Sequence, residues 1–368
     1  MLHKKSLIFN AVSYPTWADS HGLKVIITNN SAHYNATLLK FIIFNEEQDT
    51  PGICRSSGMK RAFQRGIIIH CYQLSAGGGL LFYSYSDYLV WFSIVCLAAR
   101  RHRIALLAVC PMPDHIHLSL TALSSGDLSA FMRDINREYA VHFRSVCKIS
   151  GPIFSSPFGS APKYGAKKGR TNLIYVWNNP VERQLVPRAE DYRWNFLAFA
   201  ATPHPFSRQL IIRRARKAVK EAVKEIKGLF ENGRRLNHAQ LKRIFSRLSP
   251  EESQQITDFV ISTYNNIDYA EAIKYFDSYQ DLLIAVHANT GSEHDLNEVF
   301  IGKSDKHYQR MAACIMREVR PKDIHDILSW PIGKKQDLFR FLRGCTNAPG
   351  SQIAKFLRLP MKFGSIDI

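Results

Sequence analysis

The chain has 368 residues, 46% of them hydrophobic, which is enough for two or three domains with cores of their own. Lys and Arg outnumber Asp and Glu by 49 to 31, which gives a formal charge of +18. Such a surplus costs self-repulsion unless it faces a polyanion, so the composition favours a nucleic-acid partner over a merely basic soluble protein.

Cysteine usage and hydropathy argue against two further classes of protein, those held together by disulfides or structural zinc and those that span a membrane. The seven cysteines are scattered and form no CxxC pair, which argues against a disulfide framework and a structural zinc site. The most apolar stretch, Tyr88–Ala99, spans roughly 12 residues, short of the about 20 that cross a bilayer. With no evident secretory signal, we expect a soluble, cytoplasmic protein, associated with the nucleoid and not with membranes.

Three regions are predicted along the chain. Residues 1–58 mix short β-like runs with Asn, Ser and Pro, and we interpret them as an N-terminal extension. A compact domain is expected over 59–200, and Ala201-Thr202-Pro203-His204-Pro205 is a linker candidate. Residues 206–368 are basic and helical in pattern, and the sequence shows no internal repeat.

The domain from Met59 contains a clear order of elements. The patterns predict strands over 67–74, 104–110 and 114–120, a helix over 86–101 between the first two, and a helix from 126 to about 147. This β-α-β-β-α order predicts an α+β fold with a ferredoxin-like antiparallel sheet and helices on one face. A basic loop over 151–170 and a helix from Leu173 into Asn179-Pro180 follow.

The C-terminal region is predicted to be all-α. Cations over 213–227 recur at helical spacing, which fits a solvated helix as well as a DNA-binding one. Helices are also expected over 251–264 and 270–289. Residues 335–359 predict a helix, a turn at 346–350 and a second helix, which is typical of a helix-turn-helix DNA reader and equally of an ordinary helical hairpin.

The first candidate site is His115-Ile116-His117 on the third predicted strand. Residues two apart on a strand point to the same face, so both imidazoles can reach one metal ion. Two such ligands leave coordination positions open for water or substrate oxygens. By itself this pattern also occurs in surface histidines, so it is a weak signal.

The second candidate is Tyr139, within the helix that carries Phe131 to Tyr139. A helical tyrosine is usually a half-buried packing residue. As a nucleophile it would need activation, because a phenol pKa is about 10. A metal-bound phosphate and nearby cations could supply that activation.

Four ordered blocks over about residues 66–199 resemble the single-tyrosine HUH transposases, including the REP-associated tyrosine transposases. They are the opening strand, the block around Met112-Pro113-Asp114-His115-Ile116-His117, which is similar to the family's MPNHVHLL, the helix with Arg137-Glu138-Tyr139, and a closing block. The closing block resembles the family's YIHLNPVRA…DYPWSS and reads Tyr175-Val176-Trp177-Asn178-Asn179-Pro180-Val181-Glu182, then Asp191-Tyr192-Arg193-Trp194. Four blocks in this order make the resemblance specific.

The resemblance implies an HUH endonuclease core that cleaves and rejoins single-stranded DNA near hairpins. His115 and His117 would hold Mg²⁺ or Mn²⁺ against the scissile phosphate. Tyr139 would attack the phosphorus and leave a 5′-phosphotyrosine link and a free 3′-OH, so no ATP is required. The implied partners are single-stranded DNA with hairpins, duplex DNA through the C-terminal helices, and a second copy of the chain in a homodimer.

Two departures from the family pattern concern the site. The family supplies a further polar ligand about one turn after the tyrosine, and here His142 is the candidate because Phe143 cannot ligate. Asp114 stands where the family usually has Asn. We expect the basic loop to contact DNA, although a solvated flexible loop with no such role is the alternative interpretation. The candidate contact residues are Lys163, Tyr164, Lys167, Lys168 and Arg170. Trp177 and Trp194 are expected in the core.

Two other functions stay open at this stage. A non-catalytic DNA-hairpin-binding protein derived from such a transposase would keep the fold and the basic helices. A metal hydrolase of small phosphate esters would account for the histidine pair but not for the charge.

Overall fold

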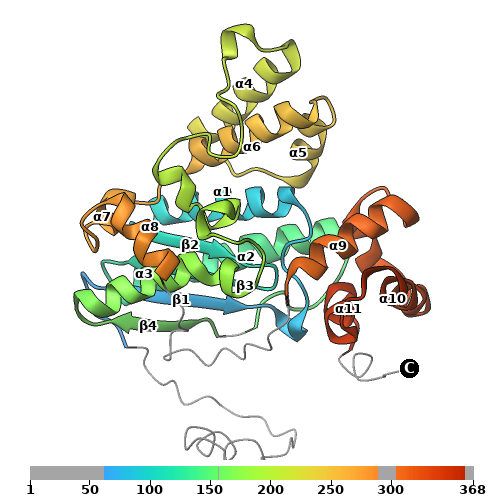
Figure 1. Ribbon diagram of the computed structural model, residues 1–368, viewed down its shortest axis with the longest axis horizontal. Helices are drawn as coiled ribbons and strands as arrows, with labels where there is room; N and C mark the ends of the chain where they lie inside the picture. Colours follow the sequence, from blue (N-terminus) through green and yellow to red (C-terminus); the bar gives the residue numbers. More distant parts are fainter. Residues whose placement is uncertain (1–61, 156, 289–303, 361–368) are drawn as a thin grey trace, which may run out of the picture. The chain divides into compact units, whose positions relative to one another are not determined.

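A four-stranded antiparallel sheet carries the residues of interest (Figure 1). A computed structural model describes residues 62–155, 157–288 and 304–360, so the predicted extension over 1–58 lies outside the described residues. The strands are ordered β2-β3-β1-β4, and every neighbouring pair is antiparallel. They span Ile68–Leu74 (β1), Ala105–Pro111 (β2), His115–Thr121 (β3) and Gly159–Lys163 (β4).

Two helices cover one face of this sheet. Helix α1 (Tyr85–Arg101) begins at a capping box made by Ser84 and Asp87, and Ser124 caps α2 (Ser125–Cys147). The two helices pack together. The order β1-α1-β2-β3-α2-β4 with this strand order is the ferredoxin-like arrangement, which confirms the predicted fold class.

The other face of the sheet is covered by α3 (Gly165–Glu182), which packs against β2, β3 and β4. The predicted basic loop over 151–170 is therefore wrong in part, because it contains β4 and the first turns of α3. Pairing with β1 imposed strand structure on Gly159–Lys163, a segment whose Gly, Ser and Pro had indicated a loop. As a result, polar residues on this face of β1 and β3 are buried beneath a helix.

The middle region consists of helices that pack on one another, on α1 and on the sheet domain. They are α4 (Lys217–Glu231), α5 (His238–Phe245), α6 (Pro250–Tyr264), α7 (Tyr269–Ile273) and α8 (Tyr279–Ala288). Helices α5 and α6 contact α1, and Leu236 donates its backbone N–H to Ser93 Oγ. The single helix expected over 270–289 is interrupted between α7 and α8. Short 3-10 turns over 189–200 connect α3 to this region, with Trp177 and Trp194 buried as expected.

The last region contains α9 (Lys306–Cys314), the 3-10 turn Ile324–Ser329, α10 (Ile332–Thr346) and α11 (Gly350–Leu357). The predicted helix, turn and helix over 335–359 are confirmed by α10 and α11, which pack on each other. This region is bonded to the sheet domain, since Tyr83 Oη donates to the Phe356 carbonyl and Arg358 to the Leu80 carbonyl, both at 2.8 Å. Within the described residues, no helix is both long and apolar enough for a membrane span.

Candidate active site

The histidine pair lies where strand alternation predicts, on one face of β3 and under α3. The rings of His115 and His117 are 4.8 Å apart between centroids and nearly perpendicular. Both side chains are buried, with 3% and 0% exposure. Two imidazoles so close on one rigid strand are suited to share an ion.

Each of these histidines has its Nδ1 atom held by another side chain. Asp114 Oδ1 lies 2.5 Å from His115 Nδ1, and His70 Nε2 of β1 lies 3.1 Å from His117 Nδ1. Such partners fix the tautomer and orientation of metal-binding imidazoles and direct Nε2 toward the ion. The two Nε2 atoms are thus the candidate ligand atoms of this pair.

Helix α3 adds two residues to the same face. Tyr175 and Asn179 are one turn apart, so they share a side of the helix. The amide nitrogen of Asn179 lies 3.3 Å from His117 Nε2, and the Tyr175 ring is 5.4 Å from the His117 ring and 5.7 Å from that of His70. Both are buried, with exposures of 3% and 1%.

The Asn179 side chain provides the test of whether these residues suit a metal ion. Its Oδ1 atom is buried and has no hydrogen-bond partner among the described residues. Because the two ends of an amide can be exchanged by a flip, this oxygen can also be turned toward His117 Nε2. A carbonyl oxygen beside two imidazole nitrogens is a donor set that Mg²⁺ or Mn²⁺ accepts. The residues therefore fit the implied ion.

Tyr139 lies on the opposite face of the sheet from this group. Gln73 and Ile116 are paired across β1 and β3 and face α2, where Asn136 donates to Gln73 at 2.7 Å, whereas His117 is paired with Tyr72 on the other face. The Tyr139 hydroxyl donates to the Leu81 carbonyl at 2.6 Å, and burial raises its pKa well above 10. The structure does not bring Tyr139 to the histidine pair, and its phenol is in an environment that disfavours the phenolate.

His142 is likewise not brought to the histidine pair. It follows Tyr139 on α2, with ring centroids 6.1 Å apart, and burial lowers its pKa to about 4. The charged groups that act on His142 include Asp87 of α1 and His325 of the turn Ile324–Ser329, and neither belongs to the histidine pair. The i+3 offset from Tyr139 keeps both residues on the α1 side of the sheet.

The residues selected for DNA contact are divided between the interior and the surface. Lys163 ends β4 and is 2% exposed, so it is not a surface contact in this conformation. Tyr164 precedes α3 and is 52% exposed, and Arg170 lies over the Phe276 ring at 4.9 Å. The exposed members of the set, at the start of α3, are Tyr164, Lys167, Lys168 and Arg170.

Charges from the C-terminal region reach the edge of the site. Lys355 of α11 forms an ion pair with Asp114, the carboxylate that holds His115. Burial alone would raise the pKa of Asp114, but His115 and Lys355 lower it well below its usual range. Burial, with Asp114 nearby, raises the pKa of Asp305 to about 6. The site thus keeps an ionised Asp114 at neutral pH.

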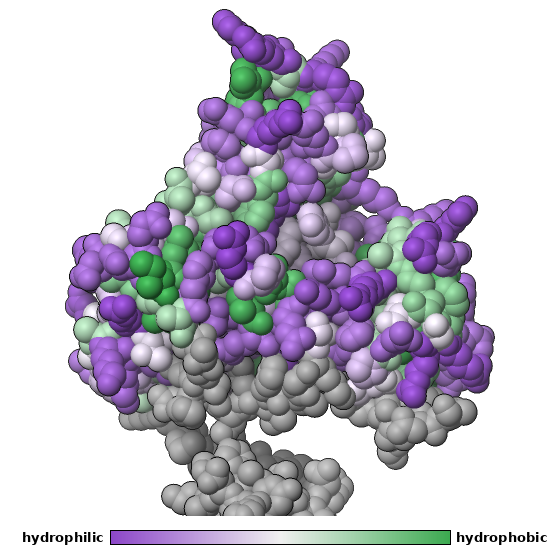
Figure 2. All heavy atoms as spheres, viewed as in Figure 1, coloured by the Kyte–Doolittle hydropathy of each residue, from purple (hydrophilic) through white to green (hydrophobic). Residues whose placement is uncertain are grey.

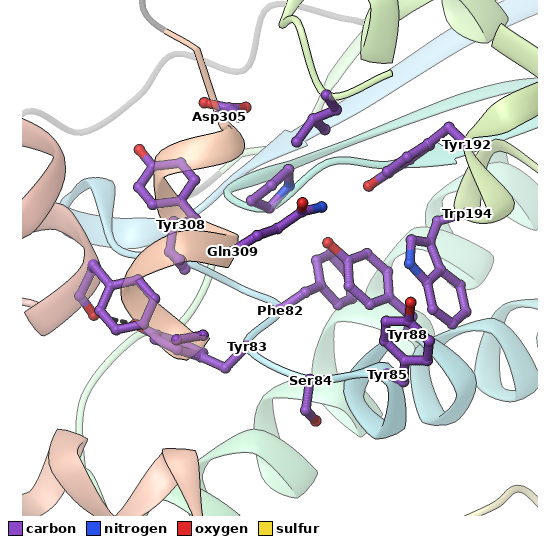
Figure 3. A pocket seen from close by; sticks show the side chains of 15 residues that line it. Phe82, Tyr83, Ser84, Tyr85, Tyr88, Tyr192, Trp194, Asp305, Tyr308 and Gln309 are labelled. Atoms are coloured by element: carbon purple, nitrogen blue, oxygen red, sulfur yellow. Dashed lines mark hydrogen bonds between the residues drawn. The ribbon is translucent and has the colours of Figure 1, made fainter. Parts of the chain in front are cut away.

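An aromatic pocket opens beside Pro113, the residue that precedes Asp114 (Figure 3). Tyr85 and Tyr88 from the start of α1 lie on one side of it, with Trp194 next to them, and Tyr308 and Gln309 come from α9. Tyr88 and Trp194 are stacked with centroids 4.4 Å apart. Stacked aromatic surface with one half-exposed ring is suited to bind a planar group.

A comparison with protein families covers the segment that contains the histidine pair. Residues 88–164 match the family model described as Transposase IS200 like. These residues belong to an IS200-like transposase domain. The matched segment contains His115, His117 and Tyr139 and ends before Tyr175. The family supports a transposase-like function for the domain.

Two further comparisons, with curated proteins and with solved structures, add no support for a function. A search of curated proteins finds no match. Among solved structures, the chain is similar to a REP-associated tyrosine transposase bound to a REP hairpin, with 18% identity over 37% of this chain and 79% of that one. The TM-score is 0.32, so this likeness is too weak to bear on function.

Sequence reasoning overlooked three residues that the geometry brings to the histidine pair, namely His70, Tyr175 and Asn179. Tyr175 and Asn179 stand within the closing block that carried the family resemblance, and their spacing of four on a helix is the signal that indicates a shared face. The face of α3 that meets the sheet depends on tertiary packing, which that spacing alone does not reveal.

Proposed function

We propose that this domain cleaves and rejoins single-stranded DNA near hairpins through a 5′-phosphotyrosine link, with Tyr175 as the nucleophile. The single observation that carries the proposal is the group formed by Tyr175, Asn179 and His117 on one face of the sheet. We propose His115 and His117 as the metal ligands, as the sequence indicated, with Asn179 as the third in place of His142.

The reaction follows from this arrangement. Tyr175 Oη gives up its proton and forms a bond to phosphorus, the bond from phosphorus to the 3′ oxygen breaks, and that oxygen leaves with the electron pair and takes up a proton in exchange. The reverse attack by a 3′-OH on the phosphotyrosine rejoins the strand and restores the phenol. A bound Mg²⁺ or Mn²⁺ would neutralise charge on the phosphate oxygens. Because the link conserves the bond energy, no nucleotide cofactor is needed.

The other residues of the site hold and orient the two metal-binding imidazoles. Asp114 and His70 keep the two imidazoles aligned through their Nδ1 atoms. Tyr175 and His117 belong to the same chain, so the proposed reaction needs no residue from a second subunit. A homodimer remains a separate proposal, to be tested by light scattering.

Access to the site requires movement. His117, Tyr175 and Asn179 are each at most 3% exposed, so a phosphate can reach them only when a covering segment shifts. Helix α11 is one segment at this edge, because Lys355 is paired with Asp114. An incoming phosphate would bring its own charge to Lys355 and so compete with that pair.

The test is cleavage of a labelled single-stranded hairpin DNA by the purified full chain with Mn²⁺, compared with His115→Ala and His117→Ala. We expect both variants to lose cleavage and to keep most of their DNA affinity, since affinity arises mainly from cations on phosphates. Loss of binding in proportion to activity would make the histidines structural.

Two outcomes would favour another function. Hairpin binding without any cleavage by the wild-type chain would indicate a DNA-hairpin-binding protein that has lost its chemistry. Hydrolysis that persists in Tyr175→Phe would indicate a metal hydrolase, in which water replaces the phenol.

A further inference from the structure

A second group of metal-ligating side chains lies away from the histidine pair. Asp87 is in the first turn of α1, His238 begins α5, and His325 is in the turn Ile324–Ser329. One ligand atom from each lies within 4.8 Å of those of the other two. We call these three residues the Asp–His cluster. It joins three segments that are distant in the sequence.

Hydrogen bonds already organise this cluster. His325 Nε2 lies 2.9 Å from Asp87 Oδ2, and His325 Nδ1 lies 2.6 Å from Asp323 Oδ1. His238 Nε2 lies 2.9 Å from the other oxygen of Asp323, and its ring is 5.1 Å from that of His325. Asp323 therefore orients both imidazoles, which is the usual role of a carboxylate behind metal-binding histidines.

Two buried imidazole nitrogen atoms, one in the Asp–His cluster and one beside it, take no part in the hydrogen-bond network of the described residues. The Nδ1 atom of His238 and the Nε2 atom of His142 are buried without a hydrogen-bond partner among the described residues. His142 is 6% exposed, and Asp87, His238 and His325 are among the groups whose charges act on it. A buried polar atom without a partner costs free energy, so a ligand that used these atoms would recover that cost.

The charges also fit a divalent ion. Asp87 and Asp323 bring two negative charges, and the Asp87 side chain is 2% exposed. A divalent cation bound by neutral imidazoles would bring two positive charges to these two carboxylates, and the group would be neutral.

We propose that Asp87, His238 and His325 bind a zinc ion that fastens α5 and the turn Ile324–Ser329 to the start of α1. Imidazole and carboxylate are zinc ligands at about 2.0–2.2 Å, so ligand atoms around a tetrahedral ion lie roughly 3.3–3.6 Å apart, and the cluster would contract by up to about 1.5 Å on binding. His142 or a water completes four ligands. This ion is distinct from the one proposed beside Tyr175, and the assignment does not depend on the proposed DNA chemistry.

The experiment uses the full chain carrying His117→Ala, so that the other candidate site contributes no imidazole from that position. After removal of metal with a chelator, zinc is added and the bound metal is counted by mass spectrometry of the desalted protein. We expect one zinc per chain and a rise in Tm, because a ligand that binds only the folded state stabilises it.

His238→Gln in the same background removes a direct ligand, so it should lower zinc affinity by at least the roughly 10- to 100-fold that loss of a ligand's outer partner costs, and abolish the rise in Tm. His287→Gln is the matched control, since His287 is also paired with a carboxylate, that of Glu190 at 2.9 Å, but is exposed and outside the cluster. It should keep the zinc. Equal binding by both variants, or no zinc bound in the parent, would overturn the proposal.

A third variant keeps the test decisive if His238→Gln does not fold. His238→Cys retains a zinc-ligating atom at this position. With Co²⁺ in place of zinc it should gain a thiolate-to-cobalt charge-transfer band that the parent lacks. A folded His238→Cys protein without that band would show that residue 238 is not a ligand.

Discussion

The rings of Tyr175 and His117 lie 5.4 Å apart between centroids at an angle of 83°, although the two residues come from different elements, α3 and β3. Tyr139, by contrast, donates its hydroxyl to a backbone carbonyl on the other side of the sheet. Tyr175 and Tyr139 therefore pack on opposite faces of the sheet, and only Tyr175 shares the face of the histidine pair.

Asn179 should be needed for metal binding rather than for folding alone. Asn179→Ala removes the oxygen beside His117, and we expect a 10- to 100-fold loss of Mn²⁺ affinity. Asn179→Asp supplies a carboxylate oxygen of nearly the same shape and should retain binding. Calorimetric titration of both variants is the measurement, and equal affinities in the two would count against a ligand at position 179.

The positioning role of His70 can be separated from catalysis. His70→Phe conserves a ring but loses the bond to His117 Nδ1, so the metal concentration for half-maximal cleavage should rise about 10-fold or more while kcat at saturating metal changes less. His102→Phe is the control, because His102 bonds to Asp134 on α2 and does not face the site. A pure loss of kcat in His70→Phe would contradict the positioning role.

Much of the fold could be predicted from the sequence, because period-two alternation on β3 and the capping residues of α1 and α2 are local signals. Strand β4 was missed, since Gly159–Lys163 is a strand only by virtue of its pairing with β1. The histidine pair was found because two residues apart on a strand always share a face. Which tyrosine lies beside that pair could not be predicted, because each candidate lies on a helix and only tertiary packing sets which helix meets the histidines.

The half-exposed ring of Tyr85 should stack on a base of bound DNA. Tyr85→Ala is expected to weaken single-stranded DNA binding by about 1–3 kcal/mol, the usual contribution of one aromatic stack. The ring is 53% exposed and edge-on to Trp194 at 5.2 Å, so its removal should leave Tm nearly unchanged. Fluorescence anisotropy with a labelled oligonucleotide measures the effect, and unaltered affinity would exclude this pocket as a base site.

Helix α4 presents an exposed row of lysines that is suited to duplex DNA, and the surface in this region is mostly hydrophilic (Figure 2). Two of its three acidic residues, Glu221 and Glu225, are paired with Arg247 and Arg243 of the neighbouring segment. Replacing the row by glutamine should lower duplex affinity and reduce the slope of log K against log salt by about 2–4, since each phosphate contact contributes about 0.9. An unchanged slope would leave the row as a solvated surface. The row consists of Lys217, Lys220, Lys224 and Lys227.

Asp305 should destabilise the protein at neutral pH. Its pKa is about 6 in the folded chain and 3.8 by reference, so the unfolded state loses its proton first and stability falls as pH rises from about 4 to 6. Asp305→Asn removes this penalty, and we expect metal-free variant protein to gain about 3 kcal/mol at pH 7.5 and little at pH 4. Urea unfolding at both pH values is the measurement, and an equal gain at the two would refute the pH dependence.

The most direct test of the central assignment is to locate the DNA-linked tyrosine. After reaction with hairpin DNA and Mn²⁺, nuclease and trypsin leave the adduct on a peptide that contains one tyrosine, either Thr171–Arg183 or Glu138–Arg144. We predict a modified Thr171–Arg183 peptide, and no adduct at all in Tyr175→Phe. An adduct on Glu138–Arg144 that survives in Tyr175→Phe and disappears in Tyr139→Phe would contradict the account.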